Sequence, residues 1–371
     1  MKRNETIYRM ALTRIPGLGI AGARNLLKIA GSASRIFEER ESLRSIIPGL
    51  SKKIFDSLHC PETLRQCESE LQFAEKNRIV CLTEADEAYP SRLRECPDAP
   101  LVLFYRGTAD LNKQHIISIV GTRNATEYGK ELCFSFLKDL QKLLPDTLVI
   151  SGLAYGIDIQ AHRAALQYGL ETIAVLAHGL DRIYPPIHRN TAAEMTEHGG
   201  VITEFPEKTR PERQNFIKRN RIIAGLSDAT IVVESAEKGG SLITADIANS
   251  YNRDCFAFPG RTNDPLSAGC NNLIRNNQAT LLQGAEEFIK AMNWDKSAQQ
   301  IPETVQRQLF PDLSPDEEFL VSLIGKHPEG IQLNTLIVES NIAINHITTP
   351  LFELEMKGII RTLAGGIYKL I

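Results

Sequence analysis

The feature that most constrains the fold is a series of short apolar runs between residues 79 and 290. They lie at 116–120, 148–150, 172–176, 201–202, 230–233 and 256–258. Most are rich in β-branched residues and apolar throughout, as is typical of strands buried on both faces. Stretches long enough for helices separate most of them, at 129–144, 158–168 and 241–250. This alternation predicts a doubly wound, mainly parallel sheet, a Rossmann-like α/β core that we place at 76–292.

The N-terminal segment, predicted as one domain over 1–75, contains the motif Ile-Pro-Gly-Leu twice, starting at Ile15 and Ile47. Each copy precedes a stretch with helical spacing, and glycine supplies the positive φ of a tight turn. The repeat therefore predicts a tandem helix-hairpin-helix (SAM-like) domain, in which N–H groups at a helix N-terminus can hold a phosphate. The cations nearby are Arg24, Lys52 and Lys53. A packing role alone is an equally open alternative, because the second copy lacks the second glycine.

The C-terminal segment, 311–371, follows a polar stretch that we interpret as a linker over 293–310. Apolar spacing predicts three helices, and 359–370 predicts a hairpin turning at Gly365 and Gly366. Three helices and a two-stranded wing describe a winged-helix domain. Its 4 basic and 8 acidic residues give a net charge of −4, which would repel phosphate. We therefore predict a protein-contact or regulatory role for this segment.

Composition excludes several classes of protein. Of 371 residues, 43 % are hydrophobic and 23 % are charged, which is typical of globular chains and not of disordered, collagenous or coiled-coil ones. Seven scattered cysteines without a C-x-x-C pair favour neither a zinc site nor a disulfide framework, so we expect no metal and a reducing cytoplasm. No apolar stretch approaches the ~18 residues of a membrane span.

Net charge argues against a nucleic-acid partner only when it is averaged over the chain. The total is −3, whereas residues 1–60 carry 11 basic and 5 acidic residues, a net of +6. Residues 205–221 carry six basic and two acidic residues, a net of +4. This asymmetry favours a nucleic-acid surface in part of the molecule.

Glycine-containing loops follow three of the predicted strands, where ligands of doubly wound sheets bind. They begin at Gly121, at Ser151 and at Lys238. None has the G-x-G-x-x-G or G-x-x-x-x-G-K-[ST] spacing, so dinucleotide binding and a Walker-type loop are poorly supported and no cofactor is expected. A phosphate-binding edge made of several loops is better supported.

The basic segment at 205–221 has an aromatic residue, Phe216, inside its cluster of cations. Single-stranded nucleic acid requires cations for its backbone and aromatic faces for its bases. Spacing alone favours a core position for Phe216, as an anchor for a helix starting near Arg219. Arg219 and Arg221 could likewise be salt-bridged scaffold residues.

A catalytic constellation is not evident. Asp158 is placed to cap the helix that carries His162, for which a capping or surface role is expected. His178, His188 and His198 lack the spacing of metal ligands. We expect a protein that is not an enzyme.

Six motifs occur in a fixed order in the core. They are Ile119-Val120-Gly121-Thr122-Arg123, Ser151-Gly152-Leu153-Ala154-Tyr155-Gly156-Ile157-Asp158, Gly179-Leu180-Asp181 with Tyr184-Pro185, Phe216 with Arg219-Asn220-Arg221, Gly240-Ser241-Leu242-Ile243-Thr244-Ala245, and Pro259-Gly260 with Gly269-Cys270-Asn271. This series resembles the bacterial DNA-processing protein A family (DprA, also called Smf). The terminal segments also resemble accessory domains of that family.

The resemblance implies a cytoplasmic homodimer that binds and protects incoming single-stranded DNA during natural transformation and helps load the RecA recombinase. Contacts to backbone phosphate would come from Gly121, Arg123, Ser151, Gly152, Gly240 and Ser241. Positive charge would come from Arg213, Arg219 and Arg221, and Phe216 would stack on a base. Lys218, Asn220 and Gly239 complete the predicted site. The chain departs from the family pattern at Ile217, where proline is common, and at Gly239, where serine is common.

Two other hypotheses compete with this one. Rossmann-like proteins of the lysine-decarboxylase-like type cleave nucleoside monophosphates with a P-G-G-x-G-T-x-x-E loop. Here Ala245 and Asp246 stand where the catalytic glutamate would be expected, which disfavours such an enzyme. The third hypothesis is a scaffold whose loops bind only protein.

Overall fold

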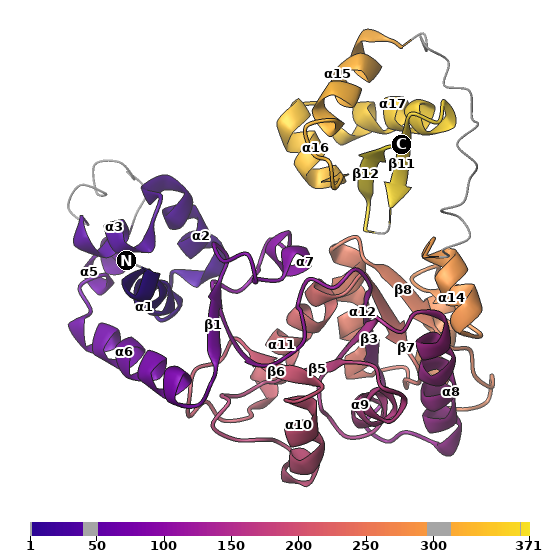
Figure 1. The fold of residues 1–371 in the computed structure, drawn as a ribbon, viewed down its shortest axis with the longest axis horizontal. Coiled ribbons are helices and arrows are strands. Elements are labelled where there is room, and N and C mark those ends of the chain that lie inside the picture. Colours follow the sequence, from indigo (N-terminus) through magenta and orange to yellow (C-terminus); the bar gives the residue numbers. More distant parts are fainter. Residues whose placement is uncertain (1, 40–50, 295–312, 364) are drawn as a thin grey trace.

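A computed structural model describes residues 2–39, 51–294, 313–363 and 365–371. In this part of the chain nine strands form one central sheet, in the order β1-β2-β6-β5-β4-β3-β7-β8-β9 (Figure 1). The strands from β6 to β9 in this order are parallel. Their bounds are β3 Ile116–Val120, β4 Leu148–Ser151, β5 Thr172–Val175, β6 Gly199–Thr203, β7 Ala229–Val232, β8 Asp254–Ala257 and β9 Thr280–Leu281. The doubly wound, mainly parallel sheet is confirmed, and β3 to β8 form at the six predicted apolar runs.

The strand order reverses between β3 and β7. After β3 the chain builds β4, β5 and β6 on one side, and it then returns to build β7, β8 and β9 on the other. The loops that leave the carboxyl ends of β3 and β7 therefore diverge. Such a reversal opens a crevice at that edge of a doubly wound sheet, and it is where ligands bind.

An antiparallel pair extends the sheet at the β6 edge, which the sequence analysis did not predict. Strand β1 (Val80–Thr83) pairs with β2 (Val102–Gly107), and β2 pairs with β6. The connection from β1 to β2 contains only loops and the short helix α7 (Ser91–Arg94), and no long crossover helix. The alternation of strand and helix that identified the other strands is therefore missing here.

Helices cover both faces of the sheet, as expected of a doubly wound fold. One face packs against α8 (Glu127–Leu143), α9 (Ile157–Tyr168), α10 (Arg189–Met195) and α14 (Ala285–Ala291). The other packs against α7, α11 (Arg213–Leu226), α12 (Gly240–Ser250) and α13 (Ala268–Arg275). The single tryptophan, Trp294, packs on Phe288 of α14 with ring centroids 5.4 Å apart and on His115, just before β3, at 4.5 Å.

The N-terminal region is helical. It contains α1 (Lys2–Thr13), α2 (Gly19–Ala30), α3 (Ala33–Glu38), α5 (Lys52–Ser57) and α6 (Pro61–Lys76). The first Ile-Pro-Gly-Leu copy forms a turn between α1 and α2, with Gly17 at φ 80°. The second copy, at 47–50, lies outside the described residues. Apolar side chains of these helices share one core with Leu101, Val102 and Phe104, at and beside β2.

Arg24 of α2, one of the cations proposed to hold phosphate, is partly buried and bonded within the protein. Its guanidinium donates to the carbonyl oxygens of Cys96 (2.6 Å) and Arg94 (3.3 Å) and forms an ion pair with Glu84 (3.1 Å). These partners lie in the segment around α7. Arg24 therefore joins the N-terminal helices to the sheet region, a use that sequence spacing did not indicate.

The C-terminal region has three helices and a small antiparallel sheet with its own apolar core. The helices are α15 (Pro315–Ile324), α16 (Leu333–Ser340) and α17 (Ile344–Met356). The sheet has the order β10-β12-β11, with β10 Ile331–Gln332, β11 Ile360–Leu363 and β12 Ile367–Leu370. The expected hairpin is present, and β10 is an additional strand. The predicted linker lies almost wholly outside the described residues. Within the described ranges, none of the helices has the length and apolar character to span a membrane.

Candidate nucleic-acid interface

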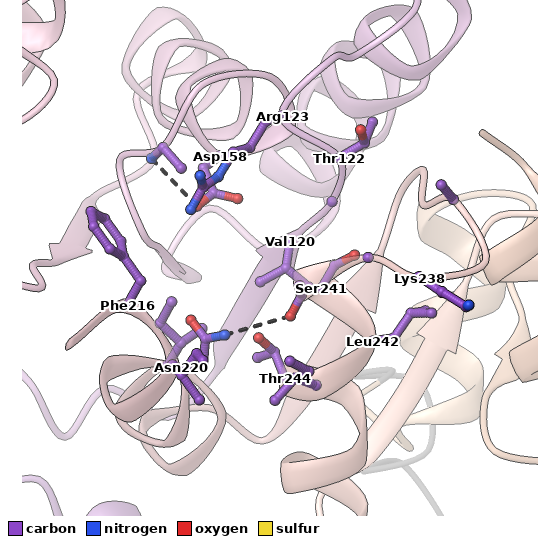
Figure 2. A pocket seen from close by; sticks show the side chains of 18 of the residues that line it. Val120, Thr122, Arg123, Asp158, Phe216, Asn220, Lys238, Ser241, Leu242 and Thr244 are labelled. Atoms are coloured by element: carbon purple, nitrogen blue, oxygen red, sulfur yellow. Dashed lines mark hydrogen bonds between the residues drawn. The ribbon is translucent and has the colours of Figure 1, made fainter. Parts of the chain in front are cut away.

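A cleft with a volume of about 930 Å³ lies at the point where the strand order reverses. Its walls are the loop after β3, the loop after β7 with the start of α12, and one face of α11. Figure 2 shows Arg123, Asp158 and Phe216 toward one side of this cleft and Lys238 and Ser241 toward the other. The cleft therefore occupies the place that the topology favours for a ligand.

Glu234 fixes the loop after β3. Its carboxylate accepts hydrogen bonds from the backbone N–H of Thr126 (2.9 Å) and from the Thr126 hydroxyl (2.6 Å), and its carbonyl oxygen accepts one from the N–H of Thr122 (2.7 Å). Glu234 is buried and directly follows the β7 run. Gly156, at φ 75°, approaches the loop so closely that a Cβ there would lie 2.1 Å from the Thr122 carbonyl oxygen. The loop that carries Gly121 and Arg123 is therefore held from two sides.

Helix α11 begins at Arg213, six residues before the start expected near Arg219. This start places Arg213, Phe216 and Asn220, at successive spacings of three and four residues, on the face that lines the cleft. Phe216 is half-buried in the cleft wall and is absent from the buried core. The core position that spacing alone favoured for Phe216 is therefore wrong.

Two guanidinium groups and one phenol surround the Phe216 ring. The Cζ atoms of Arg123 and Arg219 lie 5.4 and 5.9 Å from its centroid, and the Tyr184 ring centroid lies 6.0 Å away. Both cations lie within the distance at which an aromatic face attracts them. Phe216 thus combines an apolar surface with adjacent positive charge.

Arg219 lies beneath this surface. It is buried, and its Nη1 donates to the carbonyl oxygens of Gly152 (2.7 Å) and Val175. Burial lowers the pKa of Arg219 to about 10, and the nearby Asp158 carboxylate opposes that shift. Arg219 lines the cleft floor, but carbonyl groups already use its Nη1 donor. The scaffold alternative accounts for these contacts.

Asp158 does not cap a helix through its side chain. The N-cap of α9 is Gly156, and Asp158 lies in the first turn, where it accepts a hydrogen bond from the Ala154 N–H (3.4 Å). Burial raises the pKa of Asp158, and the Arg219 charge opposes the shift. The sequence analysis missed this electrostatic interaction between two buried groups 61 positions apart, because no local spacing encodes it.

His162, one turn after Asp158 in α9, is also buried and does not lie on the helix surface as expected. Its Nδ1 is hydrogen-bonded to the Thr172 hydroxyl (2.7 Å). Burial, together with the Arg219 charge, lowers its pKa to about 3, so that the imidazole is neutral at physiological pH. Arg219, Asp158 and His162 form a buried polar layer between the cleft and the β4–β5 part of the sheet.

The opposite wall is the N-terminus of α12. Gly239 is its N-cap and contributes no side-chain hydrogen bond, so the first N–H groups of α12 stay open toward the cleft. The Ser241 hydroxyl donates to the Ser235 hydroxyl (2.9 Å), and the Asn220 amide lies 3.5 Å from the Gly240 carbonyl oxygen, linking α11 to α12. Lys238 is exposed beside this turn and was not among the predicted site residues.

The structure brings nine of the thirteen predicted site residues to the cleft. They are Gly121, Arg123, Arg213, Phe216, Arg219, Asn220, Gly239, Gly240 and Ser241. The other four, Ser151, Gly152, Lys218 and Arg221, do not line it.

Each of the four has a physical reason for its position. The Ser151 hydroxyl is buried and donates to the Ile119 carbonyl oxygen (2.6 Å). Gly152 lies under Arg219, where a Cβ would come within 2.3 Å of Nη1. Arg221 donates to the Glu204 carboxylate and to the Asp98 carbonyl oxygen. Lys218 is exposed on another face of α11. Among the residues that the structure describes, no cluster of three or more acidic, histidine or cysteine side chains could hold a metal ion.

Comparison with known proteins agrees with the motif series. The family model for DNA recombination-mediator protein A matches residues 78–293, more than half of the chain. The chain belongs to this family. Among its DprA/Smf relatives, the Smf protein of Escherichia coli is 34 % identical over 325 residues, which cover 83 % of this chain and 85 % of the relative. The Smf protein of Synechocystis is 29 % identical over the full length of both chains.

Two solved DprA structures resemble this protein. DNA processing protein A from Streptococcus pneumoniae gives a TM-score of 0.59 at 32 % identity and covers 78 % of this chain and 97 % of that one. The Helicobacter pylori protein gives 0.53 at 29 % identity and covers 58 % and 96 %. The latter structure is described as giving insights into a unique single-stranded DNA binding mode.

Proposed function

We propose that this DprA-family recombination mediator binds single-stranded DNA in the cleft at the β3–β7 edge. The observation that carries the proposal is Phe216, half-exposed in the cleft wall with guanidinium groups 5.4 and 5.9 Å from its ring. Single-strand binding proteins combine such aromatic faces with cations along the backbone path. The single-stranded DNA binding described for the Helicobacter pylori relative supports the same assignment.

The exposed cations have separate roles from the buried one. Arg123, Arg213 and Lys238 line the cleft and are exposed, and none forms an ion pair with a described residue, so we assign them to phosphates. The open N-terminus of α12 at Gly240 and Ser241 offers N–H groups to a further phosphate. Arg219 holds the cleft floor in shape, and Phe216 stacks on a base.

Arg221, Ser151 and Gly152 act in this proposal as supports and not as DNA ligands. Arg221 is engaged by Glu204 and Asp98, and Ser151 by the end of β3. Lys218 is exposed on a side of α11 that does not line the cleft, so in this proposal it adds only long-range positive charge. Asn220 keeps α11 and α12 together through Gly240.

We further propose that the bound strand is protected and passed to RecA during natural transformation in the cytoplasm, and that the protein acts as a homodimer without turnover. In this proposal the domains are 1–75, 76–292 and 311–371, joined by the linker at 293–310. The helix order of the first fits a helix-hairpin-helix domain, and the order α15-β10-α16-α17-β11-β12 fits a winged helix. The acidic winged-helix module contacts protein and not DNA.

The test is a titration of fluorescent single- and double-stranded oligonucleotides over a range of salt. We expect tight preference for the single strand and an affinity that falls as salt rises. Arg123→Ala should weaken binding to all sequences about equally and reduce the salt slope by about 1. Lys142→Ala is the matched control, because Lys142 is an exposed cation at the far end of α8.

Three results would contradict the proposal: equal affinity for both forms of DNA, insensitivity to salt, or unchanged binding in Arg123→Ala. Release of free base from nucleoside monophosphates at a useful rate would instead favour the nucleotide-cleaving enzyme. That measurement uses the same protein and needs no DNA.

A further inference from the structure

Exposed aromatic and apolar side chains continue from the cleft onto the neighbouring surface. We name this feature the rim strip and define it as Tyr184, Ile187 and Tyr155. Their exposed fractions are 42 %, 72 % and 48 %, which are high for large apolar residues. The Tyr184 ring lies 6.0 Å from Phe216, so the strip begins where the cleft wall ends.

The rim strip is built on fixed backbone. The buried His178 accepts a hydrogen bond from the Tyr184 N–H at Nε2 (3.2 Å), and the buried His188 is hydrogen-bonded through Nδ1 to the Leu153 carbonyl oxygen (2.9 Å). The His188 ring contacts the Tyr155 ring edge to face, with centroids 5.2 Å apart. Tyr155 itself follows Ala154, which lines the cleft. Each of the two tyrosines is therefore supported by a buried histidine, Tyr184 through its backbone N–H and Tyr155 through its ring.

Two exposed cations lie near the His188 end of the strip. Arg163 and Arg189 are exposed, and neither forms an ion pair with a described residue. Arg163 lies close enough to His188 to contribute to lowering the pKa of that histidine, after the larger effect of burial. The acidic side chains nearest in sequence are Asp181, which pairs with Arg182 at 2.7 Å, and Asp158, which is buried and feels the opposite charge of Arg219. The charge around the rim strip is therefore positive.

We propose that the strand occupying the cleft continues along the rim strip, with bases stacked on Tyr184 and Tyr155 and phosphates facing Arg163 and Arg189. The inference rests on the proposed function and extends it from a cleft to a longer path. Single-stranded DNA is favoured over a protein partner because the path begins at Phe216, whose ring has two guanidinium groups within 6 Å, and because Arg163 and Arg189 are exposed near its His188 end. Aromatic stacking with a basic flank suits bases of any identity.

The path predicts that affinity depends on oligonucleotide length. We would compare thymidylate oligomers of about 6 and about 20 nucleotides, because site sizes of related single-strand binders span about 4–16. Phe216→Ala should weaken binding of both. Tyr155→Ala should weaken binding of the long oligomer by about fivefold or more and leave the short one within about twofold. Phe352→Ala, which removes an exposed ring from the C-terminal region, is the control and should change neither.

The conservative variant separates stacking from other roles. Tyr155→Phe keeps the ring and should keep the affinity for the long oligomer. Photocrosslinking with 5-iodouracil placed at successive positions of the long oligomer should give adducts on Tyr184 or Tyr155, identified by mass spectrometry. This readout does not depend on the variants being stably folded.

The outcomes distinguish failure of this inference from failure of the proposed function. If the wild-type protein binds single strands and requires Phe216, but Tyr155→Ala leaves both lengths unaffected, the path is wrong; a rim strip that binds protein would give this result. Loss of long-oligomer binding in Tyr155→Phe would overturn the stacking role. If the wild-type protein binds no single-stranded DNA at either length, the proposed function itself fails.

Discussion

Helices α11 and α17 both place a phenylalanine at the surface, and the two surroundings differ. In α11, Phe216 is half-buried between Arg123 and Arg219. In α17, Phe352 is 63 % exposed, and Glu353 and Glu355 lie beside it along the helix. An aromatic face alone does not indicate its partner. The charge around it does, because a phosphate backbone is attracted to the first setting and repelled by the second.

The layers beneath the two helices also differ. One face of α17 packs through Ile347, Leu351 and Leu354 onto an apolar core. Below α11 lies the buried polar layer of Arg219, Asp158 and His162. Buried charges are costly to hold and even more costly to leave unpaired. The layer below α11 should therefore respond to loss of a buried charge and to mild acidification, whereas the apolar side chains that α17 buries hold no group that could respond in this way.

The largest expected effect follows removal of Arg219. Arg219→Ala leaves Asp158 buried without its counter-charge and two carbonyl groups without a donor, so the free energy of unfolding should fall by about 3–5 kcal/mol. The measurement is urea unfolding followed by the fluorescence of Trp294, which reports the sheet region. Arg213→Ala, on the same helix but exposed, should stay within about 0.5 kcal/mol of the wild type. Equal stability of the two variants would show that the buried layer is not energetically distinct.

A smaller effect is expected on mild acidification. The pKa of His162 is about 3 in the folded protein, below its ordinary value of 6.5, so on acidification the unfolded chain takes up the proton first. Stability from this residue is present above about pH 6.5 and is lost as the pH falls toward 3, by about 1 kcal/mol between pH 6.5 and 5.5.

The matched variant is His162→Asn, which stays neutral and can still bond Thr172. Between pH 6.5 and 5.5 its unfolding free energy should fall by about 1 kcal/mol less than that of the wild type. This window lies above the ordinary titration range of carboxylates. Parallel pH profiles of the two proteins would refute the assignment of a neutral buried imidazole.

The smallest effect is expected in the C-terminal region. Phe352→Ala removes the exposed ring among glutamates, and single-stranded DNA affinity should change by less than about twofold, because acidic surroundings keep the strand away. Filter binding or fluorescence anisotropy at low salt is the appropriate measurement. If Phe352→Ala weakened binding as much as Phe216→Ala, surrounding charge would not be the property that separates the two helices.

Much of the fold could be predicted because buried parallel strands produce uninterrupted apolar runs. The runs at 116–120 and 230–233 became β3 and β7, and the loops after them became the cleft, since topology alone decides where those loops meet. The antiparallel pair β1 and β2 had no such signal. It lies outside the strand–helix alternation, and β1 is partly exposed.

The site was less predictable where the direction of a side chain depends on the exact start of its helix or on partners distant in the sequence. Placing the start of α11 near Arg219 instead of Arg213 gave no means of telling which cations face the cleft. Arg221 points away because Glu204 and Asp98 engage it, and these partners come from separate loops. One sequence signal could have identified Glu234 as a residue of the site. It is an acidic residue directly after a buried strand, at the point where the strand order reverses.

The close approach of Gly152 to Arg219 has a genetic consequence. Because a Cβ at position 152 would meet the guanidinium at 2.3 Å, a Gly152→Ala allele should damage the cleft through a residue that it does not replace. Its intragenic suppressors should be found at position 219, where Arg219→Lys shortens the obstructing group while keeping the charge. The two positions are therefore expected to mutate as a linked pair, although 67 residues separate them in the chain.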